Sequence, residues 1–171
     1  NMNTFSKSLT STIRISYMIL PTHLANIYYE KLGFYTCPVS TFEQYTLAEF
    51  IQQGYFERHI NRMRAYYKNL RNQLLNEIKS SPLASQIKIS EEHAGLHFLM
   101  KLDTTLSDEE IIKKAKEQNI RLSCLSDYYE HPPKESEHTL IMNYSGIRTE
   151  NIPVLVKSLS DAFCKKASKR L

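Results

Sequence analysis

A long stripe of apolar residues in the middle of the chain predicts an amphipathic helix over residues 57–78. Apolar side chains recur there every three or four positions, which is the period of one helix face. At 1.5 Å per residue such a helix is roughly 33 Å long, which is enough to connect two lobes. Pro82 then marks its end. The stripe consists of Ile60, Met63, Tyr67, Leu70, Leu74 and Ile78.

The part of the chain before this helix predicts one strand and two shorter helices. Residues 1–13 are rich in Ser, Thr and Asn and have no apolar period, so they predict a loop. Residues 14–20 are rich in β-branched and aromatic side chains and stop at Pro21, which is typical of a strand. Helices are predicted over residues 22–31 and 41–53.

The part after the long helix changes character and predicts a small sheet. Residues 86–90 and 96–102 alternate between apolar and polar side chains, and each therefore predicts a half-buried strand. Residues 120–125 and 139–144 predict two further strands, separated by a polar loop that contains two prolines.

Two helices are predicted to cover this sheet. Ser107 and Glu110 have the spacing of a capping box, which predicts a helix over residues 107–119. A last helix is predicted over residues 151–168, because apolar residues recur there at helical spacing. The C-terminal half therefore predicts an α+β lobe with helices on one face of the sheet. The basic residues Lys165, Lys166, Lys169 and Arg170 complement the dipole at the end of the last helix.

Composition bounds the class of protein that these elements build. The chain has 171 residues, of which 42% are apolar and 23% are charged, and this suits one domain or two small lobes. The 22 Lys and Arg residues against 18 Asp and Glu residues give a net charge of +4, which is too mild to indicate nucleic acid by itself. No run approaches the roughly 20 apolar residues of a membrane span, so no membrane partner is expected.

The spacing of cysteine and histidine predicts neither a disulfide framework nor a metal site. Cys37, Cys124 and Cys164 are scattered, which indicates a reducing, cytoplasmic setting. His93 and His97 lie four residues apart on an extended stretch, so they are expected to be turn and strand residues and not metal ligands. The first seven residues lack the apolar segment of a signal peptide.

The basic residues of the long helix have two interpretations. They would suit a nucleic-acid patch, or they would be solvated or dimer-facing charge on a helix that connects two lobes. Their spread around the helix favours the second interpretation. These residues are Arg58, Arg62, Arg64, Lys68 and Arg71.

The first loop carries the strongest candidate chemistry. The amine of Lys7 becomes a nucleophile toward carbonyl compounds when nearby cations or burial lower its pKa. The guanidinium of Arg14 suits a phosphate, which it binds through two parallel hydrogen bonds, and Thr4 and Ser6 add hydroxyl groups. Taken as residues alone, a Ser-Lys pair of this kind favours a solvated terminal loop.

This loop resembles a known family. The run Thr4-Phe-Ser-Lys7-Ser, followed by Arg14-Ile-Ser-Tyr17, is similar to the lysine segment of class I/II aminotransferases, which are pyridoxal-phosphate enzymes of the type I fold. The resemblance implies that Lys7 is the catalytic residue and binds the cofactor covalently. It also implies that Arg14 and Thr4 bind the cofactor phosphate, with Ser6 in the same set.

Three further stretches narrow the resemblance to a regulator family. Residues 42–74, 92–98 and 125–129 resemble the aminotransferase-like part of MocR-type regulators, which are GntR-family transcription factors with an N-terminal winged helix. The resemblance covers essentially all of the chain in order. It implies a homodimer that senses pyridoxal phosphate or an amino-acid-type effector, and DNA binding only through a winged-helix domain that this sequence does not contain.

The resemblance also implies a fold and a domain division. The fold class expected is α/β, with α+β in the C-terminal lobe, as in the C-terminal half of a type I pyridoxal-phosphate transferase. Residues 1–55 would be the end of the large cofactor domain, residues 56–80 a long interdomain helix, and residues 81–171 the small domain.

Two alternatives to a regulator stay open at this point. One is the C-terminal half of a plain aminotransferase, and the other is a small domain that folds without any cofactor function. In the family, an aspartate at the pyridine nitrogen and an aromatic residue on the cofactor ring precede the lysine. Because the given sequence starts six residues before Lys7, this chain alone is expected to bind pyridoxal phosphate weakly or not at all, and not to transaminate.

The carboxylate of a substrate or effector has no assigned partner in the sequence. Many aminotransferases bind it with an arginine in the strand that begins the final segment, and Ile141 falls at about that position. Arg121 and Arg148 lie nearby in sequence, but no motif gives either of them this role. Surface solvation is the expectation for both.

Overall fold

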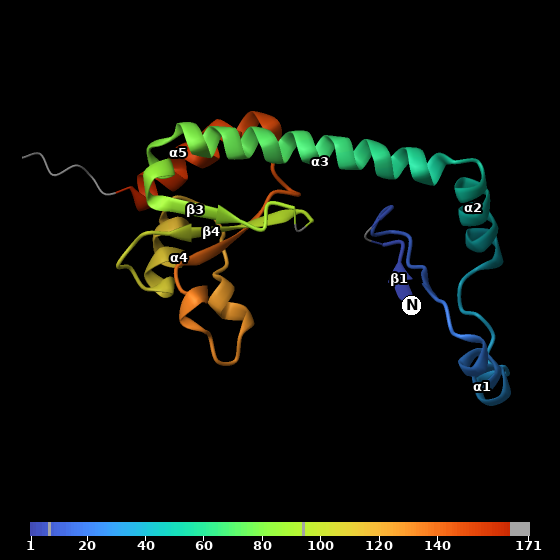
Figure 1. Ribbon diagram of the computed structural model, residues 1–171. Helices are drawn as coiled ribbons and strands as arrows, with labels where there is room; N and C mark the ends of the chain where they lie inside the picture. The colour runs from blue at the N-terminus through green and yellow to red at the C-terminus, as the bar shows by residue number, and fades with distance from the viewer. Residues whose placement is uncertain (7, 94, 165–171) are drawn as a thin grey trace, which may run out of the picture. The chain divides into compact units, whose positions relative to one another are not determined.

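The computed structural model describes residues 1–6, 8–93 and 95–164, and the chain divides into two compact units (Figure 1). Unit 1 comprises Asn1–Ala65 and unit 2 comprises Tyr66–Leu171. The boundary falls inside the long helix α3 (Tyr55–Ser80), which confirms the helix predicted over residues 57–78 and extends it at both ends.

Unit 1 contains a hairpin, two helices and the start of α3. Strands β1 (Met2–Thr4) and β2 (Ser16–Met18) pair antiparallel, with Asn3 opposite Tyr17. The loop predicted over residues 1–13 is therefore wrong at its start. Backbone hydrogen bonds extend the hairpin, since Ile19 N donates to Asn1 O at 2.7 Å. Backbone pairing of this kind needs no apolar period in the sequence, and for this reason the pattern did not predict β1. Helices α1 (Thr22–Leu32) and α2 (Thr41–Gln52) confirm the two helices expected.

Unit 2 is built on a three-stranded antiparallel sheet in the order β3-β4-β5. The strands are β3 (Ile87–Ser90), β4 (His97–Leu102) and β5 (Thr139–Asn143), and all three follow the predicted positions. Phe98 of β4 lies opposite Met142 of β5, and Met100 lies opposite Leu140. This register places the large apolar residues of both strands on the same face of the sheet.

Helices cover that one face of the sheet, as expected, because their buried residues share one core with the buried residues of the strands. They are the second half of α3, α4 (Asp108–Glu117) and α5 (Ile152–Phe163). Along β4, every second side chain is buried, so only one face of the sheet is covered. The capping box of α4 is confirmed, because Glu110 N donates to Ser107 Oγ at 3.3 Å and Ser107 N donates to Glu110 Oε2 at 2.8 Å.

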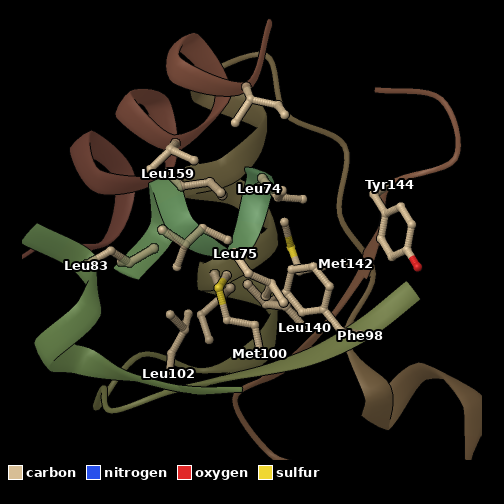
Figure 2. Packing of buried hydrophobic residues seen from close by; sticks show 14 of the residues in the cluster. Leu74, Leu75, Leu83, Phe98, Met100, Leu102, Leu140, Met142, Tyr144 and Leu159 are labelled. Carbon is tan, nitrogen blue, oxygen red and sulfur yellow. The ribbon is translucent and has the colours of Figure 1, made fainter. Parts of the chain in front are cut away.

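A single hydrophobic core lies between the sheet and these helices (Figure 2). Leu74, Ile78 and Phe98 are fully buried in it, and Leu75 joins them although the apolar stripe of α3 did not predict it. The strand side of the core consists of Phe98, Met100, Leu102, Leu140 and Met142, and the helix side includes Leu70, Leu74, Leu75, Ile78, Ile111, Val156 and Leu159.

Two predicted elements of unit 2 end early. Residues 120–125 form only one isolated bridge, between Cys124 and Leu140, and then turn into the 3-10 helix η2 (Leu125–Tyr128). The carboxylate of Asp127 accepts a hydrogen bond from Cys124 N at 3.0 Å, which caps the start of η2 and ends the pairing with β5 at Cys124. Helix α5 ends at Phe163, and the basic end predicted for it lies outside the described residues.

Within the described ranges, none of the helices combines the length and the apolar character that crossing a bilayer requires.

Candidate functional site

The loop between β1 and β2 holds the predicted site residues. Phe5 N donates to Ile15 O at 2.9 Å, which continues the strand pairing one step into the loop. The chain then turns, because the amides of Ser8 and Leu9 both donate to Phe5 O. Lys7 lies outside the described residues, so its place in this loop stays a prediction.

The hydroxyls of Thr4 and Ser6 bind the opposite side of the loop. Thr4 Oγ1 donates to Ile15 O at 3.2 Å, and Ser6 Oγ donates to Ile13 O at 2.6 Å. The two acceptor carbonyls belong to the residues directly before and after Arg14. The backbone of Arg14 is therefore held opposite residues 4–6, and the structure brings Thr4, Ser6 and Arg14 together on one hairpin.

The two residues that flank Arg14 line an apolar cavity, and Arg14 does not. Ile13 and Ile15 line this cavity, which has a volume of about 340 Å³ and is closed on the other side by Phe42, Leu47 and other residues of α2. Arg14 is exposed. The alternation Ile-Arg-Ile is the signal by which the sequence marks this arrangement.

Arg14 suits a phosphate ligand better than the hydroxyls of Thr4 and Ser6 do. An exposed guanidinium has free donors in the geometry that a phosphate prefers, so Arg14 suits this ligand. A hydroxyl has one hydrogen, and the hydrogens of Thr4 and Ser6 are donated to backbone carbonyls. In this conformation the two hydroxyls hold the loop in position, and their role as phosphate donors stays a prediction.

The other candidates from the sequence occupy unit 2. Arg71 Nη1 donates to His93 Nδ1 at 3.0 Å and to Glu92 O at 2.8 Å, so His93 helps to hold the loop between β3 and β4. The described residues contain no group of three or more potential metal ligands. Arg121 and Ile141 line one cavity of about 450 Å³, and Arg148 is exposed and is not part of its lining. The sequence did not predict this cavity.

Comparison with known proteins finds relatives among transcriptional regulators. No protein-family model matches it. It is 36% identical over 163 residues to the uncharacterized HTH-type transcriptional regulator YdeL of Bacillus subtilis, which covers 95% of the chain and 34% of YdeL. It is 30% identical over 162 residues to the probable rhizopine catabolism regulatory protein MocR of Rhizobium meliloti, covering 95% of the chain and 32% of that protein. The homologues of this chain are MocR-type regulators.

The match concerns one part of these MocR-type relatives. The chain spans about a third of the length of the curated relatives that it matches. The part matched is the aminotransferase-like part, which confirms the family resemblance seen in the sequence.

The solved structures that resemble the chain are aminotransferases. The kynurenine aminotransferase of Pyrococcus horikoshii superimposes with a TM-score of 0.75 at 21% identity, covering 95% of this chain and 39% of the aminotransferase. At this identity the likeness shows the fold alone. It confirms the expected α/β, aminotransferase-like fold, and pyridoxal-phosphate dependence is a property of that family.

Proposed function

We propose that this chain is the effector-binding and dimerisation part of a pyridoxal-phosphate-dependent MocR-type transcriptional regulator. The observation that carries the proposal is the identity of 36% and 30% to two regulators along 95% of the chain, against 21% to the aminotransferase of similar fold. A third of the relatives' length is matched, so DNA binding is proposed for a winged-helix domain outside this chain.

The proposal divides the chain into three parts. Residues 1–55 belong to the large cofactor domain, residues 56–80 form the interdomain helix, and residues 81–171 form the small domain. In support, the boundary between the two compact units falls at residue 65, within the proposed helix.

Each residue of the first loop has a proposed task. Lys7 attaches the cofactor through its amine, and Arg14 neutralises the phosphate through its guanidinium. Thr4 and Ser6 hold the backbone on either side of Arg14, and this is supported by their bonds to Ile15 O and Ile13 O. When bound, pyridoxal phosphate supplies an aldehyde that reacts with amines and a ring that withdraws electrons. This chemistry suits an amino acid as effector.

A homodimer is proposed from the surface of unit 1. None of its described side chains is buried, although it carries many large apolar residues. Phe34, Phe42 and Tyr45 each expose more than two thirds of their surface, at 74%, 78% and 75%. Apolar surface of this extent is typical of a region that packs against other polypeptide. We assign that polypeptide to a partner subunit and to the rest of the cofactor domain.

An aminotransferase is the second candidate function, and the fold favours it. The structure superimposes on an aminotransferase with a TM-score of 0.75. The coding sequence directly upstream of Asn1 separates the two candidates. A winged-helix pattern there supports the regulator, and an ordinary aminotransferase N-terminal arm without one contradicts it.

The cofactor site is tested by trapping. The chain is incubated with limiting pyridoxal phosphate, reduced with borohydride and mapped by peptide mass spectrometry. We expect label on Lys7 in excess of label on Lys31, an α1 lysine that serves as the internal reference. The variant Lys7→Ala should lose the specific label and the cofactor absorbance, whereas Lys31→Ala should keep both. Equal label on the two lysines contradicts the assignment of Lys7.

The same preparation tests whether the chain transaminates. No amino-group transfer from an amino acid to a 2-oxo acid is expected from this polypeptide alone. Measurable turnover that Lys7→Ala abolishes would favour the aminotransferase.

A further inference from the structure

We propose that unit 2 contains a binding site for a small carboxylate with an apolar tail, in which Arg121 binds the carboxylate. The site is the cavity of about 450 Å³ that lies beside β5, and its volume is within the range of small-molecule sites. All of its lining residues belong to unit 2, so the site does not include the residues proposed to bind pyridoxal phosphate.

The cavity exists because a neighbouring segment pairs with β5 at one end only. Ile141 N donates to Ser123 O at 3.0 Å, and Cys124 forms an isolated bridge with Leu140. Among the described residues, no backbone hydrogen bond joins β5 to residues 120–122, which directly precede Ser123 in that segment. The segment and the strand are unpaired there, and the cavity lies between them.

The polar lining of this cavity favours an anion. Its charged residue is Arg121, and Ser123 and Tyr128 contribute hydroxyls. The side-chain oxygen of Asn143 accepts hydrogen bonds from Ser145 N at 2.9 Å and from Ser145 Oγ at 2.8 Å, which leaves the amide NH2 as the group that Asn143 can offer. No aspartate or glutamate is among the described lining residues. The site therefore offers one fixed positive charge and several donors.

The rest of the lining favours an apolar group. Ile141 takes the place at which the family resemblance expects a carboxylate-binding arginine, so this wall of the cavity carries no charge. A ligand that satisfies both parts has a carboxylate at one end and a branched or aromatic hydrocarbon group at the other. The apolar lining consists of Ile120, Leu122, Ile141, Met142, Ile147 and Leu155.

A second cavity of unit 2 has the opposite charge to the Arg121 cavity. It is lined by the acidic residues Asp108, Glu109, Asp127 and Glu137. A carboxylate is repelled by such a lining, whereas the cavity with Arg121 attracts it. Of the two, the Arg121 cavity alone has the electrostatics that an anionic ligand needs.

The test uses one acid and its uncharged analogue on the whole chain. The probes are 4-methylpentanoate and 4-methylpentanamide, which share the apolar tail and differ in charge. Binding is followed by two-dimensional nitrogen-15 NMR titration without pyridoxal phosphate. We expect saturable shifts confined to the amides of residues 120–123 and 141–147. The acid should bind more tightly than the amide, by roughly tenfold, because a charge-assisted hydrogen bond replaces a neutral one.

Variants of Arg121 test whether its positive charge, and not the shape of the cavity, determines the preference for the acid. Arg121→Gln should weaken binding of the acid by roughly tenfold and leave binding of the amide unchanged. Arg121→Lys should retain part of the preference for the acid. Arg148→Gln is the matched control, because Arg148 is exposed and does not line the cavity, and it should change neither affinity. Since both arginines are exposed, these variants are expected to fold.

Three outcomes would contradict a carboxylate site at Arg121. Shifts outside the cavity, equal affinity for acid and amide, or equal effects of Arg121→Gln and Arg148→Gln would each contradict it. Lys7→Ala serves as a further control and should bind the acid as the wild type does. Loss of the carboxylate site therefore leaves the proposal for Lys7 intact, and loss of the Lys7 label leaves this site intact.

Discussion

At the scale of single residues, Cys124 illustrates how burial changes the chemistry of a side chain. Its side chain is fully buried next to α4. Burial raises the pKa of the thiol to about 12, and the carboxylates of Asp108, Asp127 and Glu109 add to this rise. A thiol with this pKa is protonated at neutral pH and is a poor nucleophile.

The buried thiol predicts a fall in stability at alkaline pH. An unfolded cysteine loses its proton near its ordinary pKa of 9.0, whereas folded Cys124 keeps it up to about pH 12. Its contribution is therefore complete below pH 9.0 and is lost as the pH rises toward 12, by up to about 1.4 kcal/mol per pH unit. Urea denaturation at several pH values measures this. In Cys124→Ala the free energy of unfolding should fall less steeply as the pH rises from 9.0 toward 12. An unchanged dependence on pH would show that the thiol does not cause the fall.

Tyr144 provides the second prediction at this scale. Its ring is buried against Phe98, and its hydroxyl donates to Gly95 O at 2.6 Å. Tyr144→Phe should lower the free energy of unfolding by about 1 kcal/mol, because the Gly95 carbonyl loses its partner. Tyr67→Phe is the control, since that ring packs against Tyr144 at a centroid distance of 6.5 Å and lies at the edge of the core. Equal losses in both variants would contradict the role of the hydrogen bond.

The sequence suggested candidate site residues but not their hydrogen bonds. The family resemblance placed Thr4, Ser6 and Arg14 in one cofactor site, and that role stays a prediction. The direction of the two hydroxyls toward Ile13 O and Ile15 O depends on how the hairpin closes, and the residue pattern does not specify that.

At the scale of elements, the hydrophobic period predicted most of unit 2. Strands β4 and β5 and helix α4 lie where alternation and capping placed them. The strand expected over residues 120–125 has the same alternation and is reduced to one bridge. The carboxylate of Asp127 accepts the hydrogen bond of Cys124 N and caps the turn into η2, so pairing with β5 ends after Cys124. Residues 120–122 make no backbone hydrogen bond to β5 among the described residues. Alternation shows which face of a segment is apolar; it does not show how many of its residues pair with a neighbouring strand.

The capping box of α4 gives a prediction at this scale. Ser107→Ala should lower the free energy of unfolding by about 1 kcal/mol, because the amide of Glu110 then lacks its acceptor. Ser107→Asp should restore most of the loss, since aspartate is also a good N-cap residue. Urea denaturation followed by circular dichroism checks both. Equal stability of the alanine and aspartate variants would contradict a capping role.

At the scale of the whole molecule, the two units differ in how they bury apolar surface. The stripe of α3 is continuous in sequence, yet Ile60 and Met63 are only half-buried whereas Leu70 and Leu74 belong to the core. The helical period shows which face of a helix is apolar. It does not show what covers that face, and for this reason the sequence did not predict that the core is confined to unit 2.

Hydrogen exchange should reveal this difference within one helix. Amides of α3 from Leu70 onward should exchange roughly tenfold or more slowly than those of residues 57–65, because only the former lie on a buried core. Mass spectrometry of peptides from the two halves provides the measurement, and each half is the control for the other. Uniform protection along α3 would show that unit 1 is as stable as unit 2.

The sheet of unit 2 has one further consequence, which concerns solubility during folding. Strand β3 is at the edge of the sheet, and among the described strands it pairs only with β4. It is four residues long and exposes Lys88. A short edge strand with a lysine is poorly suited to pair with the same edge of another molecule, because the charge must be desolvated and two like charges brought together. This edge therefore resists the strand-to-strand association that leads to aggregation.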